Sequence, residues 1–116
     1  MLRLNRGLIG IAQGSRILFS DFIDGGAMWT GTGPREDRSK VIFEDTFDFP
    51  PVVTVAISMW DIDHSTNSRM DISAEAVTAK GFDIVFRTWG DSRVARIRAS
   101  WTAIGSLNDP DLWNVD

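Results

Sequence analysis

The sequence predicts an all-β domain, built as an antiparallel sandwich or a small barrel. Three observations support this prediction. The composition, with five Trp, seven Phe and ten Gly among 116 residues, favours strands and turns over helices. Apolar and polar residues alternate through most of the second half of the chain, which is the pattern of half-buried strands. Glycines, prolines and short polar runs separate these alternating segments.

The first half of the chain carries weaker strand patterns. Short strands are predicted over residues 16–19 and 40–43. Between them, residues 24–34 are rich in glycine, and residues 35–39 are charged or polar. This composition predicts a long surface loop over residues 24–39.

The strand predicted over residues 52–60 has the clearest pattern. Pro50 and Pro51 precede it, at a position where missing backbone N–H groups do little harm. Its apolar face consists of Val53, Val55, Ile57 and Met59. Residues 61–68 are polar and predict a loop after this strand.

Residues 71–80 fit two descriptions. As a helix, the segment would begin with Asp71 as N-cap, contain several alanines and end at Gly81. As a strand, it would alternate Ile72, Ala74 and Ala76 with polar residues. We expect a strand, because strands flank the segment at regular spacing and the alternation is clean.

Two further strands are predicted toward the end of the chain. Residues 82–87 and 95–103 both alternate, and the turn at residues 90–92 separates them. Four large apolar residues on the core-facing sides of the alternating strands are expected to be buried: Phe82, Phe86, Ile57 and Trp101.

Charge and composition exclude several classes of protein. The net charge of −4, with a pI of about 4.8, argues against a protein that binds nucleic acids through their phosphate backbone. The chain has no cysteine, so a disulfide scaffold, a thiol nucleophile and a cysteine-ligated metal are excluded. The apolar stretch at residues 8–12 is too short for a signal peptide or a membrane span, so we expect neither.

Three neighbouring residues, Asp61, Asp63 and His64, suggest a metal site. Calcium needs six or more oxygen ligands and zinc needs three convergent ones, so we expect no metal and no cofactor. A single histidine in a polar loop, without a nucleophile elbow, is also weak support for a hydrolase. A carboxylate pair for glycoside hydrolysis is still possible, because such residues pair in space rather than in sequence. We nevertheless expect that the protein is not an enzyme and has no catalytic residue.

Four arginines lie close together in the sequence: Arg87, Arg93, Arg96 and Arg98. The simplest interpretation is a solvated sheet face on which they pair with acids such as Asp71, Glu75 and Asp83 on neighbouring strands. A subunit interface or a site for an acidic sugar is the alternative.

An ordered set of residues in the second half resembles an H-type lectin domain, the family that includes the snail agglutinin and the C-terminal domain of the discoidins. The set consists of Phe43, Phe47, Pro50, Pro51, Val52, Val53, Ile57, Asp61, Asn67, Arg69, Val77, Gly81, Phe82, Thr88, Trp89, Ser100, Trp101 and Ile104. The resemblance implies a six-stranded antiparallel β-sandwich. It also implies homotrimers, sometimes stacked into hexamers, that bind galactose or N-acetylgalactosamine at clefts between subunits.

The resemblance divides the chain into three parts. Residues 39–105 form the lectin-like sandwich, and residues 1–38 contribute an N-terminal strand and the glycine-rich loop to the same domain. Residues 106–116 form a C-terminal tail that carries Trp113. By family analogy the protein is extracellular or on a surface, but the sequence leaves its location open.

The same resemblance selects the candidate sugar-binding residues. Arg69 matches the family's sugar-contacting arginine, and its guanidinium can donate to adjacent hydroxyls. Trp89 matches the tryptophan before a turn and can stack on a pyranose. Packing in the core is the alternative role for Trp89. Asp37 or Glu36 is expected to supply the acid that accepts hydrogen bonds from sugar hydroxyls, and Gly90 and Asp91 complete the turn.

Two positions depart from the family's pattern. The family has histidine and tyrosine where this chain has Gly90 and Ala95, so two sugar contacts are missing. We therefore expect a non-catalytic carbohydrate-binding module for galactose-type or acidic sugars. The alternative is a structural or adhesion module of a larger surface or phage-like assembly that has lost sugar binding. The sequence leaves the sugar and the choice between trimer and hexamer open.

Overall fold

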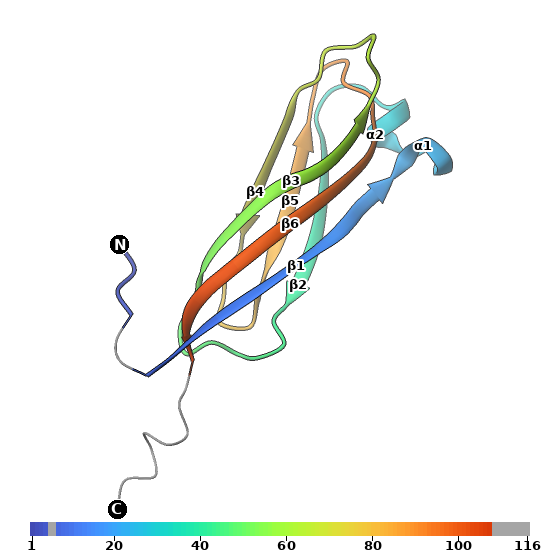
Figure 1. The fold of residues 1–116 in the computed structure, drawn as a ribbon. Coiled ribbons are helices and arrows are strands. Elements are labelled where there is room, and N and C mark those ends of the chain that lie inside the picture. Colours follow the sequence, from blue (N-terminus) through green and yellow to red (C-terminus); the bar gives the residue numbers. More distant parts are fainter. Residues whose placement is uncertain (5–6, 108–116) are drawn as a thin grey trace, which may run out of the picture.

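A computed structural model describes residues 1–4 and 7–107 and shows two three-stranded antiparallel sheets, with strand orders β1-β6-β3 and β2-β5-β4 (Figure 1). The predicted six-stranded antiparallel sandwich is therefore confirmed. The elements, in chain order, are β1 (Leu8–Ser20), α1 (Asp21–Asp24), α2 (Ala27–Thr30), β2 (Arg35–Ile42), β3 (Val52–Ile62), β4 (Met70–Glu75), β5 (Gly81–Thr88) and β6 (Val94–Leu107).

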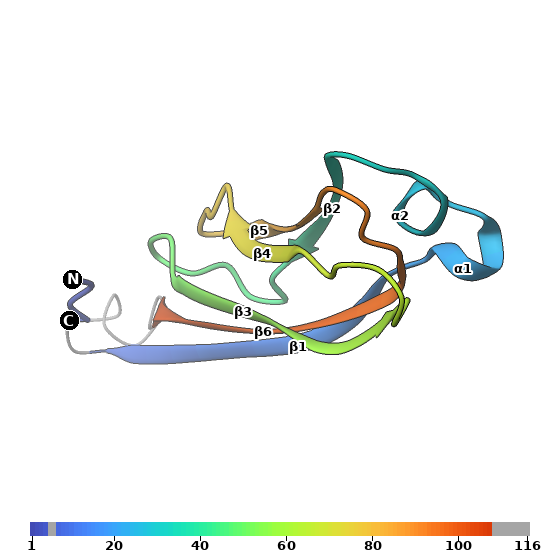
Figure 2. The same cartoon turned by 90° about the horizontal axis from the view of Figure 1, so that it is seen from above.

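The two sheets lie face to face, and the two short helices lie at one end of the sandwich (Figure 2). Aromatic and aliphatic side chains from both sheets fill the space between them because alternate residues of each strand point inward. Phe82 and Phe86 are buried as predicted. Ile57 and Trp101 were also expected to be buried but are only partly buried. Trp101 packs against the group of core residues around Phe82, and Ile57 packs against the group around Phe86.

The strands of the first half are longer than predicted. β1 covers 13 residues rather than four, because it pairs along β6 from Leu8 to Ser20. β2 begins at Arg35, inside the stretch predicted as a loop, because residues 35–42 pair with β5 over their whole length. The loop prediction for residues 35–39 is therefore wrong. Residues 35–39 are polar because they belong to a strand whose outer face is charged.

The glycine-rich stretch before β2 also contains structure that the sequence did not predict. The helix α2 forms within it, and α1 directly precedes it, with Gly25 and Gly26 between the two helices. The Asp21 carboxylate accepts a hydrogen bond from the backbone N–H of Met28 (2.9 Å), which ties the start of α2 to α1. A Cβ on Gly26 would collide with that carboxylate, so glycine is needed for this approach.

The ambiguous segment at residues 71–80 is a strand, as predicted, but only as far as Glu75. Ala76 then adopts a left-handed conformation with φ of 51°, and the chain turns. Val77, rather than Ala76, packs against the core. Gly81 begins β5 rather than forming the turn, and a Cβ there would collide with the carbonyl oxygen of Val41.

Strand β6 runs on to Leu107, past the expected boundary at residue 105. Trp113 and the rest of residues 108–116 lie outside the part of the chain that the structure describes. Within residues 1–4 and 7–107, no helix has the length and apolar character that crossing a membrane requires.

Candidate functional site

One end of the β2-β5-β4 sheet gathers most of the residues that the sequence selected. The register aligns Arg35 of β2 and Met70 of β4 with Thr88 of β5. Trp89 directly follows β5 and Arg69 directly precedes β4, so they lie side by side at this end. The indole of Trp89 is 42% exposed, which rules out the fully packed core role for this residue.

Two buried hydroxyl groups hold the backbones of Arg69 and Trp89 together. The Thr88 hydroxyl donates to the carbonyl oxygen of Arg69 (2.6 Å), and the N–H of Arg69 donates to Oγ of Ser92 (2.9 Å). The Ser92 hydroxyl donates to the carbonyl oxygen of Trp89 (3.0 Å). The backbone is thus fixed while the side chains of Arg69 and Trp89 stay at the surface.

Gly90 shapes the turn between Trp89 and β6. Its φ of 70° lies in the left-handed region that glycine adopts without strain. A Cβ at this position would lie 3.6 Å from Cδ and Nε of Arg69, so the arginine stem lies beside the turn. The backbone N–H of Gly33, just before β2, donates to the carbonyl oxygen of Gly90 (2.9 Å).

Asp91 follows Gly90 in the turn and carries a charged carboxylate. The amide side chain of Asn67 donates to its Oδ1 at 3.3 Å, and the backbone N–H of Asn67 donates to its Oδ2 at 3.4 Å. The pKa of Asp91 is lowered, first by the backbone hydrogen bond from Asn67 and also by the positive charge of Arg69. Asp91 therefore places a negative charge near Arg69 at neutral pH.

The two candidate acids lie on opposite faces of β2. Glu36 is opposite Arg87 on the outer face, where a cavity of about 260 Å³ is lined by Glu36, Arg87, Trp89 and three neighbours. Asp37 is opposite the buried Phe86 and therefore faces the interior. The lining of the cavity at Trp89 includes Glu36 and does not include Asp37.

Asp37 lies in an unusual environment for a carboxylate. Its Oδ2 is buried and has no hydrogen-bond partner among the described residues. Burial raises its pKa, and the negative charge of Asp21 raises it further.

Arg35 is a structural residue of this site that the sequence placed in a surface loop. Its guanidinium donates to five backbone carbonyl oxygens, so it joins α2, the start of β2 and the turn after β5. The acceptors are Gly33 (2.9 Å), Ala27 (3.3 Å), Met28 (3.1 Å), Gly90 (3.2 Å) and Ser92 (2.9 Å). No local pattern could have revealed this role, because Gly90 and Ser92 are 55 and 57 residues away in the sequence.

The predicted pairing of arginines and acids on a sheet face is confirmed for Arg87. Its guanidinium lies 3.0 Å from Glu36, 2.8 Å from Glu75 and 4.0 Å from Asp71. The hydrogen bond from Arg87 lowers the pKa of Glu75 to about 2. Arg38, rather than Arg87, pairs with Asp83 (3.1 Å). These ion pairs engage the guanidinium of Arg87 beside the cavity.

The other members of the arginine group lie elsewhere. The guanidinium of Arg93 lies 4.2 Å from the ring centroid of Trp29 and 3.1 Å from Oδ2 of Asp63. Arg96 and Arg98 belong to the other sheet. The Asp63 carboxylate also accepts hydrogen bonds from the backbone and hydroxyl of Ser65, so protein donors occupy this candidate metal ligand.

Comparisons with known proteins identify a domain family and several similar proteins. The family profile described as the H-type lectin domain matches residues 38–104. The chain is 61% identical, over the whole length of both proteins, to a Fuscovulum blasticum protein named ATP synthase subunits region ORF 7. It is 36% identical over 81 residues to a discoidin-1 polypeptide of Dictyostelium discoideum, covering 69% of this chain and 32% of that protein.

The fold is also similar to a solved structure. Discoidin II of Dictyostelium discoideum matches with a TM-score of 0.72 and 25% sequence identity, over 86% of this chain and 38% of that one. The chain therefore spans about a third of the length of the discoidins that it matches.

Proposed function

Because the chain belongs to the H-type lectin domain family, we propose that it is a non-catalytic module that binds carbohydrate. The observation that best supports this proposal is the half-exposed indole of Trp89, which shares a cavity with Glu36 and lies beside Arg69. An exposed aromatic ring, a guanidinium and a carboxylate are the groups that a pyranose needs for stacking, donation and acceptance.

The chemistry assigns a role to each residue of this site. Trp89 covers an apolar C–H face of the sugar, and Arg69 donates to its hydroxyls. Glu36 accepts hydrogen bonds from hydroxyls, and we prefer it to Asp37 because Asp37 faces the interior. Gly90 lets the ligand approach the backbone of the turn, while the negative charge of Asp91 attracts the guanidinium of Arg69.

A galactose-type neutral sugar is the ligand that we favour. For the alternative, an acidic sugar, the exposed Arg69 would supply the positive charge, and the nearby charged carboxylate of Asp91 opposes a second anion there. Arg87 is already paired with Glu36 and Glu75. Arg93 is engaged by Asp63 and Trp29. Ala95 is only 5% exposed, so that position offers no ligand contact, and we expect weak affinity at each site.

Weak sites become useful when several of them engage together, and we propose a homo-oligomer, a trimer or a hexamer, that presents several copies of this site. A row of exposed apolar residues supports association. Ile11, Ile104 and Val52 are direct neighbours across β1, β6 and β3 on the outer face of that sheet. Burying this row against a second copy removes apolar surface from water.

A structural or adhesion module that has lost sugar binding is the second candidate. Gly90 and the buried Ala95, at positions where the family has histidine and tyrosine, favour it. A glycan array probed with the full-length oligomer at high concentration distinguishes the two candidates. Binding to galactose-terminated glycans that free galactose competes away supports the lectin. An array without any bound glycan contradicts sugar binding and leaves the structural module.

A further inference from the structure

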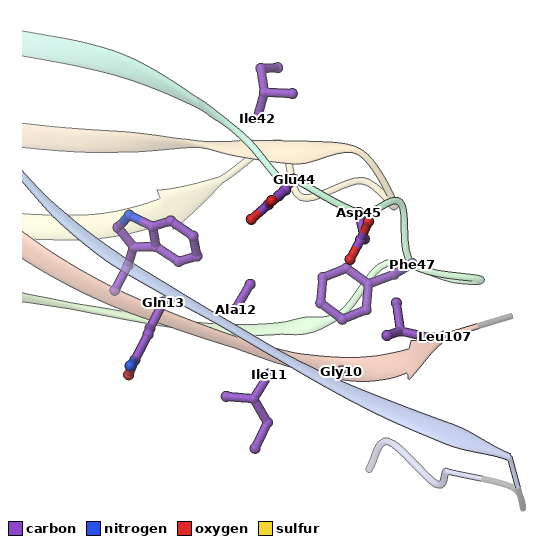
Figure 3. A pocket seen from close by; sticks show the side chains of 10 residues that line it. Gly10, Ile11, Ala12, Gln13, Ile42, Glu44, Asp45, Phe47 and Leu107 are labelled. Atoms are coloured by element: carbon purple, nitrogen blue, oxygen red, sulfur yellow. The ribbon is translucent and has the colours of Figure 1, made fainter. Parts of the chain in front are cut away.

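A second cavity opens at the side of the sandwich, between β1 and the segment that follows β2 (Figure 3). Its volume is about 410 Å³. It shares no lining residue with the cavity at Glu36 and Trp89, and the two lie at opposite ends of β2. The sugar site proposed above therefore leaves this groove without a role.

The walls of the groove are apolar and its rim is acidic. Trp101, Phe47 and Leu107 contribute apolar side chains. Glu44 and Asp45 are exposed, and their side chains project from the segment after β2 toward β1 (Figure 3). None of the 10 lining residues is a lysine, an arginine or a histidine.

The indole of Trp101 is held in place as one wall of this groove. Its ring packs against Phe82 (5.4 Å between centroids) and Phe43 (5.9 Å). Strand β1 lies directly on the indole at Gly14, where a Cβ would come within 2.9 Å of the ring. Because Trp101 remains partly exposed, a fixed aromatic surface faces the groove.

We propose that this groove binds an organic cation, an ammonium or guanidinium group on an apolar stem. Two carboxylates attract the positive charge, and the partly exposed indole of Trp101 adds apolar contact to the stem. The apolar walls cover the stem, and no lining cation opposes binding. The same features disfavour an anion. A free alkylamine and the side chain of a lysine or arginine in a polypeptide share this chemistry.

The test uses the full-length protein and n-butylammonium, which has the stem and charge of lysine. We expect this probe to shift the NMR signal of the Trp101 indole N–H, with saturation at millimolar concentrations. Raising the salt concentration should weaken the binding, because exposed charge pairs are screened. n-Butanol, which has the stem without the charge, is expected to bind at least about fivefold more weakly, because hydrogen bonds from charged groups are the stronger ones.

Matched variants locate the site. E44Q/D45N removes both rim charges at exposed positions and is expected to weaken n-butylammonium binding at least about tenfold. D48N is the control, because Asp48 is an exposed acid of the same loop that does not line the groove. Equal shifts with n-butanol, or unchanged binding by E44Q/D45N, would overturn the proposal. A capped Val-Lys-Val peptide distinguishes the two sources of the cation. Tighter binding of this peptide than of n-butylammonium would identify a polypeptide side chain as the ligand. Weaker or equal binding would identify a free amine.

Discussion

The guanidinium of Arg35 lies 2.9 Å from the carbonyl oxygen of Ser92, a residue 57 positions later in the chain. This hydrogen bond joins the start of β2 to the turn that carries Gly90 and Asp91. The Ser92 hydroxyl in turn bonds the backbone of Trp89. Arg35 thus positions the turn beside the candidate sugar site and also lines the cavity that Glu36 and Trp89 share.

Replacing Arg35 with alanine should lower the free energy of unfolding by about 2–4 kcal/mol, because several charge-assisted hydrogen bonds are lost together. Chemical denaturation measures the change. Arg96→Ala is the matched control, since Arg96 is exposed on the other sheet, and it should cost less than about 0.5 kcal/mol. Equal stabilities of the two variants would contradict the positioning role of Arg35.

Phe86 lies at the centre of the core with no exposed surface. Phe86→Ala should therefore cost about 3–5 kcal/mol of unfolding free energy, from lost burial and the cavity that remains. Ile104→Ala, at an exposed position of β6, should cost less than about 1 kcal/mol in a monomeric reference state. A small loss for Phe86→Ala would mean that the assigned inner face of β5 is wrong.

Arg69 should carry a large part of the sugar affinity. Arg69→Ala is expected to cost roughly 1.5–3 kcal/mol of binding free energy, enough to abolish weak binding, because one charged donor to the ligand is lost. Titration calorimetry with a multivalent galactose ligand measures the change, and Arg96→Ala again serves as the control. If the variant stays folded and oligomeric and binds its glycan unchanged, the site lies elsewhere.

Asp37 should make stability depend on pH. Because the pKa of Asp37 is raised in the folded state, the native protein binds a proton at this carboxyl more tightly than the unfolded chain does. The stabilisation from this proton is complete below the ordinary pKa of 3.8. That contribution is lost as the pH rises through the folded pKa. Asp37→Asn should therefore be more stable than the unmodified protein at neutral pH, with the difference shrinking in acid. Melting temperatures across this pH range check the sign, and a parallel pH dependence in both proteins contradicts it.

The exposed apolar row on the β1-β6-β3 sheet should mediate assembly. Light scattering at micromolar concentration is expected to give the mass of a trimer or hexamer. Ile104→Glu places a charge in the row and should shift the protein toward monomer. Ile23→Glu changes another exposed isoleucine, on α1, and should leave the mass unchanged. A monomer mass for the unmodified protein would refute the assembly.

The strands β3, β5 and β6 were predictable because the order of apolar and polar residues within each strand indicates which of its faces is buried. A strand with one buried face must alternate apolar and polar residues, so the core positions at Phe82 and Phe86 follow from spacing alone. The turn at Gly90 was predictable for a related reason, since glycine and aspartate mark a backbone conformation that other residues avoid. The resemblance to a known family selected Arg69 and Trp89 in the same way, from short motifs.

The sequence by itself therefore determined the all-β class, the inner faces of the main strands and the turn of the candidate site. Only the tertiary structure decided that the charged residues 35–38 form a strand, because pairing with β5 and ion pairs across the sheet outweigh their local preference for a loop. It also decided between Glu36 and Asp37. Neighbouring residues of a strand point to opposite faces. The pairing of Glu36 with Arg87, 51 residues later in the chain, selects which of the two acids reaches the cavity beside Trp89.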